Sequence, residues 1–401
     1  MRILHIIGSM DPSTGGPCQG IRNSAPALEE FSVYREVVCF DTPDAAYLGS
    51  DIFPIHALGV KKNAWYYSPK FVPWLQDNLH RFDAVITNGL WLYHSQATRK
   101  VIQRHRKSRT AGNELRWFVM PHGMLDPYFQ LTRERKLKAV RNWIYWKLME
   151  HKVVNQADGI LFTTEIELIL ARKTFSHYHP QRETNVGYGI ETPPAYSTDM
   201  RSVFLEKCSA LGEQPYLLFL SRINYKKGVD LLIKAYNTIL SESPDQTKIP
   251  KLVIAGPGLD TSYGQEMKRL IANTPTLSAS IFFPGMLTGN AKWGALYGCD
   301  AFLLPSHQEN FGIAVAEALA CGKPVLISNQ VNIWQTLEND GSGLVADDTL
   351  AGTEQLLRQW LAFTPTNKKA MGDKARGTFE HHFGIEQAAL RFKEAISLRA
   401  I

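Results

Sequence analysis

Short apolar runs alternate along this chain with segments in which apolar residues recur every three or four positions. Residues 2–7, 216–220 and 301–304 are such runs, and their length and composition are typical of buried strands. Residues 229–236 and 383–396 have the helical period instead, the latter as an amphipathic helix. Alternating strands and helices predict an α/β protein built from doubly wound parallel sheets.

The length of the chain predicts two such domains. It has 401 residues, 44% of them hydrophobic, which is enough for two ordinary cores. Residues 188–200 are rich in Pro, Gly and hydroxyl side chains, as domain junctions often are. We therefore expect a first domain over 1–190, a second over 191–378, and a C-terminal helix over 379–401.

The most informative segment, residues 305–328, places two carboxylates around the start of one predicted helix. A buried strand ends at Pro305, a loop containing Gly312 follows, and Gly322 ends the helix. Free backbone amides and the helix dipole at such a start favour a phosphate. Glu309 precedes this end, and Glu317 lies about two turns into the helix, where sugar or ribose hydroxyls would satisfy a buried carboxylate.

Two cations follow another apolar run. Arg222 and Lys227 come directly after strand 216–220, at the end of a parallel strand where ligands bind. A fixed guanidinium and a flexible ammonium there would neutralise a leaving pyrophosphate without a metal ion. Lys226 adds a third cation, which we expect to point elsewhere.

The first half of the chain offers two further strand-to-loop sites. Gly15 and Gly16 follow the first strand and permit close approach of the backbone to a ligand. His122 follows the run 117–120, held between a proline and a glycine. For Asp126 in the same loop, two interpretations stay open. We expect it either to contact a sugar or the molecule that accepts one, or to form a helix cap or an Asx turn ahead of Pro127.

These segments together resemble the retaining GT-B glycosyltransferases of family 4. The E-x7-E segment with the following A-x-A-C-G-K-P-V is the closest match, over some twenty residues. The loop 221–228 is similar to the family's G-R-x-x-x-x-K-G, with Ser221 in place of the usual Gly, and Tyr188 replaces the usual Asn at the junction. The resemblance implies two Rossmann-like domains facing across a cleft, with the C-terminal helix crossing back to the first.

The resemblance also assigns roles to individual residues. Catalytic roles are implied for His122, Glu309, Arg222 and Lys227. Among these, His122 would bind the donor sugar or steer the acceptor. Donor-binding positions are Gly15 and Gly16 near the diphosphate, Gly285, Met286 and Leu287 near the base, Asn310, Phe311 and Gly312 near phosphate or sugar, and Glu317 at the ribose. No metal ligand and no bound cofactor is expected, because such enzymes commonly need no metal and no D-x-D motif is present at a strand end.

Charge is concentrated in the first half of the chain. Residues 1–190 hold 24 Lys and Arg against 17 Asp and Glu. Within them, 133–152 combines seven of these cations with Trp143, Tyr145, Trp146 and Leu148 at helical spacing. We favour a core-packing helix with a basic solvated face, and keep open a peripheral contact with anionic lipid at a membrane. No aromatic and basic module accompanies the charge, so nucleic acid is not expected as a partner.

Cysteine usage and hydropathy predict where the protein works. The five cysteines form no metal-binding spacing and fit a reducing compartment. The first residues predict a strand rather than a signal peptide, and no apolar run is long enough to span a bilayer. We expect a cytoplasmic protein, with the inner membrane face as a peripheral site.

The combined sequence features and resemblance predict a retaining hexosyltransferase. It would move a sugar from a UDP- or GDP-linked donor to a hydroxyl on a glycan or lipid-linked acceptor, in polysaccharide or glycolipid biosynthesis. Two alternatives stay open: a sugar-nucleotide epimerase on the same fold, which would need further acids and bases in the first domain, and a non-catalytic sugar-nucleotide-binding protein.

Overall fold

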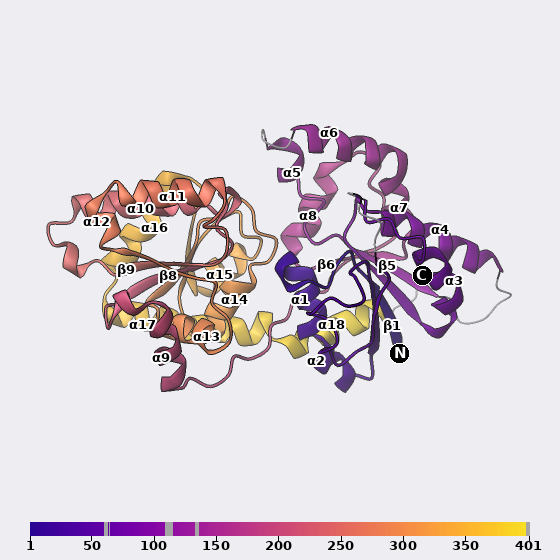
Figure 1. The fold of residues 1–401 in the computed structure, drawn as a ribbon, viewed down its shortest axis with the longest axis horizontal. Helices are drawn as coiled ribbons and strands as arrows, with labels where there is room; N and C mark the ends of the chain where they lie inside the picture. Colours follow the sequence, from indigo (N-terminus) through magenta and orange to yellow (C-terminus); the bar gives the residue numbers. More distant parts are fainter. Residues whose placement is uncertain (60–62, 64, 109–114, 133–135, 398–401) are drawn as a thin grey trace. The chain divides into compact units, whose positions relative to one another are not determined.

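The computed structural model describes residues 1–59, 63, 65–108, 115–132 and 136–397, which form two compact units. The first comprises Met1–Glu191 together with the segment that begins at Ile385, and the second comprises Thr192–Gly384. The first boundary falls one residue after the predicted junction, and the second falls six residues after the predicted start of the C-terminal segment. Each unit has its own sheet (Figure 1).

The first unit contains a seven-stranded parallel sheet in the order β3-β2-β1-β4-β5-β6-β7. The order reverses between β1 and β4, so the loops that follow these two strands diverge to opposite faces of the sheet. The strands are β1 (Arg2–Ile6), β2 (Tyr34–Cys39), β3 (Ile55–Ala57), β4 (Ala84–Asn88), β5 (Arg116–Met120), β6 (Gly159–Phe162) and β7 (Glu183–Asn185).

Alternate strand residues of this sheet enter two different cores, because successive side chains of a strand point to opposite faces. Leu4 and Val119 face the core under helices α3, α4, α7 and α8. Ile3 and Phe118 face the core under α2 and α18. The helices of the unit are α1 (Gly16–Asn23), α2 (Ala25–Glu30), α3 (Phe71–Asn78), α4 (Tyr93–Ser108), α5 (Tyr128–Leu131), α6 (Lys136–Tyr145), α7 (His151–Gln156), α8 (Glu165–Thr174) and α18 (Ile385–Ser397).

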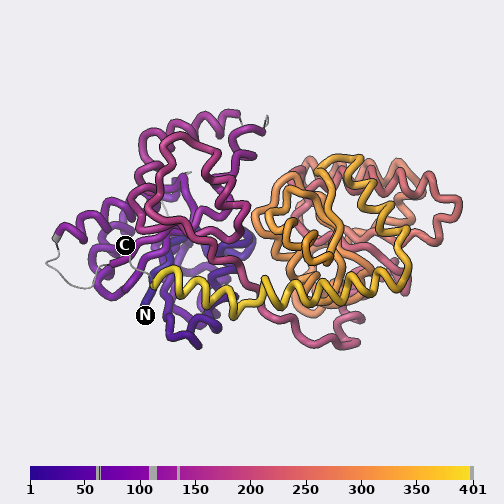
Figure 2. The backbone as a smooth tube through the Cα atoms, turned by 180° about the vertical axis from the view of Figure 1, so that it is seen from behind, coloured from indigo at the N-terminus to yellow at the C-terminus, as the bar shows by residue number. Residues whose placement is uncertain are grey.

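The last helix, α18, belongs to the first unit although it is last in sequence. Its apolar stripe, which includes Ala389, Phe392 and Ile396, is buried in the same core as Leu28 of α2. Figure 2 shows it, in yellow, beside the indigo N-terminal segments of that unit. The amphipathic pattern of 383–396 therefore corresponds to a helix that completes the first sheet's cover.

The second unit contains a six-stranded parallel sheet in the order β10-β9-β8-β11-β12-β13. Its order reverses between β8 and β11, with helices on both faces (Figure 1). The strands are β8 (Tyr216–Leu220), β9 (Lys251–Ala255), β10 (Ile281–Gly285), β11 (Ala301–Leu304), β12 (Val325–Ser328) and β13 (Gly343–Ala346). The helices are α9 (Thr198–Lys207), α10 (Val229–Glu242), α11 (Ser262–Ala272), α12 (Pro275–Ser278), α13 (Gly289–Gly298), α14 (Ile313–Ala320), α15 (Trp334–Asp340), α16 (Leu350–Ala362) and α17 (Pro365–Thr378).

Two glycines fix the loop after β8 against its neighbours. A Cβ on Gly228 would lie 2.0 Å from the Pro305 carbonyl oxygen, and a Cβ on Gly256 would lie 1.9 Å from that of Ser221. Both glycines also have positive φ, which side chains rarely adopt. The loop that carries Arg222 and Lys227 is therefore held close to the ends of β9 and β11.

The basic segment predicted over 133–152 differs from its expected packing. Residues 133–135 lie outside the described residues, and α6 begins at Lys136. Its apolar side chains are largely exposed, with Leu137 at 89% and Trp143 at 53%, although Trp146 in the following π-helical turn is buried and stacks on Phe175. The interpretation as a core-packing helix was therefore wrong for α6. In the described part of the chain, no helix is both long and apolar enough to cross a bilayer.

Candidate functional site

The sheet edge between β8 and β11 collects most of the residues predicted for the second half of the chain. In a doubly wound sheet, ligands bind beyond the carboxyl ends of the strands where the strand order reverses. The loop after β8 carries Arg222 and Lys227, and the loop after β11 carries Glu309. Parallel pairing of β8 with β11 brings these loops to the same edge.

Lys227 and Glu309 form an ion pair across this edge. Only 6% of the Lys227 side chain and 21% of the Glu309 side chain are exposed. Burial acts to raise the pKa of Glu309, but the charges of Lys227 and Lys226 and two hydrogen bonds lower it below its usual range. The carboxylate is therefore ionised at neutral pH, and an ammonium and a carboxylate lie side by side at the centre of the edge.

Arg222 supplies a second cation to the same loop. Its side chain is exposed, and within the described residues it has no hydrogen-bond or ion-pair partner. A guanidinium in this state is available to an anion from solvent. Both predicted cations after β8 are thus present, but the expectation of a fixed guanidinium and a flexible ammonium was wrong: Lys227 is buried and paired, whereas Arg222 is exposed.

Two helices begin at this edge without an N-cap side chain, although at α10 the Tyr263 hydroxyl accepts from the Asp230 amide of the first turn. Helix α10 starts after Gly228, and α14 starts after Gly312, which has φ of 86°. Uncapped first-turn amides and the helix dipole favour an anion. Of the other residues predicted here, Asn310 is half-buried, whereas Phe311 is buried and packs edge-on against Phe383, 5.5 Å between ring centres.

Glu317 is paired with a lysine that the sequence patterns did not identify. Lys292 of α13 donates to Glu317 Oε1 over 2.7 Å, and its ammonium lies 4.0 Å from the ring centre of Trp293. Glu317 is half-buried on α14. Lys292 lies alone on its helix in sequence, so no motif marked it. The two residues together form a polar position beside the start of α14.

The three residues predicted to lie near a nucleotide base differ in exposure. Gly285 ends β10 with φ of 78° and open space where a Cβ would be. Met286 is exposed and Leu287 is buried by the protein itself. Met286 therefore offers an apolar side chain to a ligand, whereas Leu287 does not.

The first unit places its predicted residues at the corresponding reversal, between β1 and β4, and in the loop after the neighbouring strand β5. Gly15, with φ of 102°, caps α1, which begins at Gly16. His122 follows β5 with φ of 51°, a conformation uncommon for a residue with a side chain. The Gly15–Gly16 turn and His122 lie in loops that follow β1 and β5, the two strands separated by β4.

His122 is the first residue of a buried polar relay. Its Nε2 lies 3.0 Å from Asn88 Oδ1, and Asn88 Nδ2 lies 3.2 Å from His5 Nδ1. Asn88 Nδ2 also donates to the carbonyls of Ile6 and Ile86, which fixes the orientation of the amide. Burial lowers the pKa of His122 to about 4, so the ring is neutral at pH 7. The Nε2 proton points to Asn88, and Nδ1 keeps a lone pair that can accept a hydrogen bond.

A buried carboxylate holds the His122 loop in place. Glu167 accepts a hydrogen bond from the backbone of Gly123 over 2.5 Å and from the amide and hydroxyl of Thr163 over 2.9 and 2.8 Å. Its own amide donates to Thr164 Oγ1 at 3.0 Å, so the Thr164 hydroxyl caps the start of α8. Sequence patterns did not lead us to Glu167, although the T-x-x-E spacing of 164–167 could have pointed to it.

Asp126 has a local role. Its Oδ1 accepts from the Tyr128 amide over 2.8 Å, which is an Asx turn leading into α5. Of the two interpretations left open for this residue, the turn is the one that its contacts support.

A cavity of about 690 Å³ opens beside these loops in the first unit. Its walls come from the loops after β3, β4 and β5 and from α6. They are rich in aromatic side chains, among them Trp65, Trp91, Phe129 and Tyr145, with Arg141 and Asn142 as polar groups. Glu150 accepts from the Trp91 amide at 3.2 Å and from Ser95 Oγ at 2.7 Å, which positions one wall. A cavity of this size holds a small organic ligand.

No group of three or more His, Cys, Asp or Glu side chains suited to a metal ion occurs among the described residues. The metal independence expected from the sequence stays a prediction.

Sequence comparison connects the second unit to a known family. The profile of the family described as Glycosyl transferases group 1 matches residues 204–376, which include Arg222, Lys227, Glu309 and Glu317. D-inositol 3-phosphate glycosyltransferases are similar in sequence: that of Kineococcus radiotolerans is 26% identical over 240 residues, covering 56% of this chain and 54% of the relative. That of Acidothermus cellulolyticus is 29% identical over 209 residues, which cover 49% of this chain and 44% of the relative. The chain thus spans about half the length of the curated relatives it matches.

Structural comparison extends over the whole chain. Sucrose-phosphate synthase from Thermosynechococcus elongatus has a TM-score of 0.74 at 19% identity, covering 99% of this chain and 98% of that one. HepE from Anabaena, in complex with UDP and glucose, has a TM-score of 0.74 at 16% identity, covering 99% of both chains. Likeness at this identity concerns the fold. The predicted GT-B fold class, with two Rossmann-like parallel sheets, is confirmed.

Proposed function

We propose that this protein is a retaining glycosyltransferase that transfers a hexose from a nucleoside diphosphate, UDP or GDP, to a hydroxyl group. The ion pair between Lys227 and Glu309 carries the proposal, because it lies where β8 and β11 diverge, beside Arg222 and the uncapped start of α14. The match of residues 204–376 to group 1 glycosyltransferases supports it.

The charges at this edge suit a sugar diphosphate. Lys227, Arg222 and the amides at the start of α14 would stabilise the negative charge that develops on the diphosphate as it leaves. Glu309, ionised beside Lys227, would accept hydrogen bonds from the sugar hydroxyls. Glu317 would accept hydrogen bonds from the ribose, with Lys292 orienting the carboxylate.

The proposed chemical step is attack from the face that the diphosphate leaves. The acceptor oxygen bonds to the anomeric carbon, while the bond from that carbon to the phosphate oxygen breaks with its electron pair remaining on the phosphate. The acceptor proton passes to that phosphate oxygen, so the configuration at the anomeric carbon is retained. His122, neutral and with a free lone pair at Nδ1, would accept a hydrogen bond from the donor sugar or the acceptor rather than act as the main base.

The aromatic cavity of the first unit is the proposed acceptor site. Trp65, Trp91 and Tyr145 offer flat apolar faces against which the faces of a sugar ring pack, and Arg141 offers a charged donor. This composition suits a glycan or a lipid-linked glycan. The curated relatives are named for D-inositol 3-phosphate, which is also a hydroxyl acceptor.

The surface beside this cavity fits a peripheral contact with an anionic membrane on the cytoplasmic side. Helix α6 and the turn after it expose Leu137, Val140, Trp143, Ile144 and Leu148. Lys136, Lys138, Arg141 and Lys147 are exposed on the same segment, and the acidic residue described there, Glu150, is buried. Apolar side chains flanked by cations are attracted to anionic lipid.

Vesicle flotation tests this contact. We expect the protein to float with vesicles that contain anionic lipid and to remain in solution with neutral ones. Replacing Leu137 and Trp143 by Ser should abolish flotation, whereas replacing the exposed Leu390 of α18 by Ser should not. Equal flotation with neutral and anionic vesicles would contradict the charge complementarity.

The donor site is tested by metal-free calorimetry with UDP, GDP and ADP. We expect one nucleotide to bind and Glu317→Ala to weaken its binding at least tenfold. Glu242→Ala is the matched control, because this carboxylate is exposed in the same unit and pairs with Arg358 instead. Absence of binding at millimolar nucleotide, or equal binding by both variants, would overturn the donor site as proposed.

A further inference from the structure

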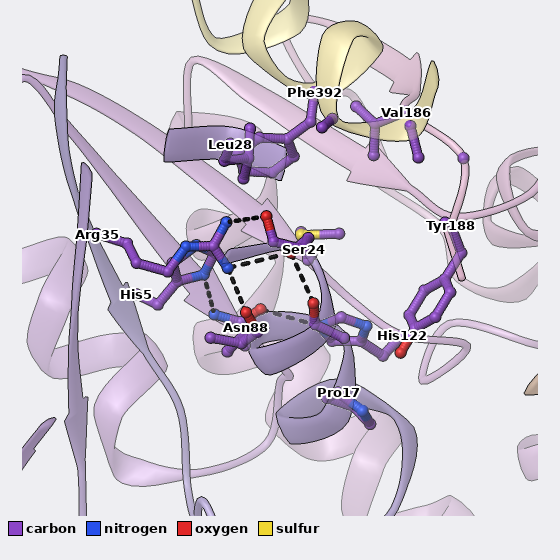
Figure 3. Close-up of a pocket in the computed structure, with 17 residues that line it drawn as sticks. His5, Pro17, Ser24, Leu28, Arg35, Asn88, His122, Val186, Tyr188 and Phe392 are labelled. Carbon is purple, nitrogen blue, oxygen red and sulfur yellow. Dashed lines mark hydrogen bonds between the residues drawn. The ribbon is translucent and has the colours of Figure 1, made fainter. Parts of the chain in front are cut away.

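A second, smaller cavity lies on the α1 and α18 face of the first unit. It measures about 60 Å³, roughly four times the ~15 Å³ that one water molecule requires. Its walls are formed by β1, β2, the ends of β4 and β5, α1, α2, α18 and the segment 186–189, and His122 also lines it (Figure 3). Most of this wall is apolar, and the polar side chains gather at one place, where Arg35, His5 and Asn88 lie together.

Arg35 is buried in this wall without a counter-ion. Arg35 is 3% exposed, and no carboxylate among the described residues forms an ion pair with it. Glu29 influences its pKa only through its charge. The terminal nitrogens of Arg35 donate to neutral oxygens, those of Ile21, the Ser24 hydroxyl at 3.1 Å and the Ser24 carbonyl at 3.3 Å. Its Nε–H has no acceptor within the described structure, and the guanidinium carbon lies 5.9 Å from the ring centre of Phe53. A buried cation in this condition is costly unless an anion joins it.

His5 contributes a second unused donor to the same cavity. It is 4% exposed, and burial together with the charge of Arg35 keeps its pKa well below 6.5, so the ring is neutral. Because Nδ1 accepts from Asn88, the proton of the neutral ring is on Nε2, and Nε2 has no partner among the described groups. The ring stacks on Phe392 of α18, 6.1 Å between centres, which fixes its orientation.

We propose that this cavity is a binding site for a small oxyanion, of phosphate or carboxylate size, held by Arg35 and His5. One oxyanion would accept the hydrogen bonds of both unused donors and balance the guanidinium charge. Each buried donor left without an acceptor is destabilising, whereas neutral water would satisfy the donors but leave the charge unbalanced. The site is separate from the proposed donor edge, which lies in the other unit.

The position of the site gives its occupation a structural consequence. Gly187, Tyr188 and Gly189 in its wall directly precede the boundary at Glu191, and Ala388 and Phe392 come soon after the boundary at Gly384. These are the two places where the chain passes from one unit to the other. A bound oxyanion would therefore stabilise both connecting segments, and the polar relay from His5 through Asn88 reaches His122.

Calorimetry and thermal unfolding with inorganic phosphate and with acetate test the site, against sodium chloride at equal ionic strength. We expect saturable binding of at least one oxyanion, with a rise in Tm that chloride does not produce. Arg35→Met should weaken binding at least tenfold. Arg106→Met should leave it unchanged, because Arg106 pairs with Asp158 elsewhere in the first unit. Preference for phosphate or for acetate identifies which oxyanion the cavity takes.

Two further variants keep the outcome interpretable. Phosphate can also occupy the proposed donor edge, so the titration is repeated with Lys227→Met, in which the Arg35-dependent binding should persist. Where Arg35→Met does not fold, His5→Phe, which keeps the stacking on Phe392, should still weaken binding at least tenfold. Absence of saturable binding at 10 mM of either oxyanion in the unaltered protein, or loss of binding with Lys227→Met alone, would overturn the proposal.

Discussion

The two sheet edges share one strand topology but differ in their chemistry. In both units the strand order reverses between the strands that are first and fourth along the chain: β1 and β4 in the first unit, and β8 and β11 in the second. The edge of the second unit carries ionised groups, namely the Lys227–Glu309 pair and the exposed Arg222. The edge of the first unit carries a neutral histidine hydrogen-bonded to an amide.

This difference shows that the topology sets where a site lies, and side chains set what it does. A charged edge suits a ligand whose charge changes during reaction, such as a diphosphate. A neutral, aromatic edge suits a ligand that binds through hydroxyls and ring faces. The following four changes test whether the division of chemistry between the units holds.

The largest effect is expected from Lys227→Met, which removes the buried cation of the charged edge. Losing a preorganised charge and leaving Glu309 unpaired should lower the transfer rate about 10³-fold. This corresponds to a rise of about 4 kcal/mol in the activation free energy. The measurement is the initial rate with the donor identified by calorimetry. Lys234→Met is the control, since Lys234 forms an exposed pair with Asp230 on α10. A rate within threefold of the unaltered protein would place the critical charge elsewhere.

Gly256→Ala should destabilise the second unit by about 3 kcal/mol or more. Its φ of 140° disfavours a side chain, and the new Cβ would lie 1.9 Å from the Ser221 carbonyl oxygen. Gly377→Ala in α17 is the matched substitution, because its Cβ would meet open space. It should raise the free energy of unfolding by about 0.5–1 kcal/mol. Urea unfolding measures both. Equal stability of the two variants would show that the loop after β8 is not held by this contact.

His122→Ala should lower transfer about 10- to 100-fold while leaving nucleotide affinity unchanged. The loss corresponds to one hydrogen bond of about 1.5–3 kcal/mol to donor sugar or acceptor. Steady-state kinetics and calorimetry with the nucleotide separate the two quantities. His151→Ala, on α7 in the same unit, serves as the control. A parallel loss of nucleotide affinity would contradict the assignment of nucleotide binding to the second unit alone.

Glu150→Gln should change the pH dependence of stability. Burial raises the pKa of Glu150 from 4.5 to about 7, so its contribution to stability is fully present below pH 4.5 and is lost as the pH rises through about 7. Gln does not ionise, so the variant does not lose this contribution. Relative to the unaltered protein, its free energy of unfolding should rise by about 2 kcal/mol between pH 5 and pH 8. Urea unfolding at the two pH values measures the difference. A constant difference would show that Glu150 stays ionised.

Much of the charged edge was predictable because its residues are close in sequence to strong patterns. Arg222 and Lys227 follow an apolar strand, and Glu309 and Glu317 flank a helix start, so each is located by local periodicity. Lys292 was not predictable, because it meets Glu317 only through the packing of α13 beside α14. The neutral relay had the same difficulty: Asn88 connects His5 to His122 across three strands.

The sequence by itself determined the alternation of strands and helices, the two-domain division and the loops that carry the predicted donor residues, because these depend on hydrophobic period and on local turn residues. Only the tertiary structure decided the ionic partners, the neutral state of His122, the exposed apolar face of α6 and the place of α18 in the first core. Contacts between residues far apart in sequence, and the burial that sets a pKa, depend on packing that no local pattern records.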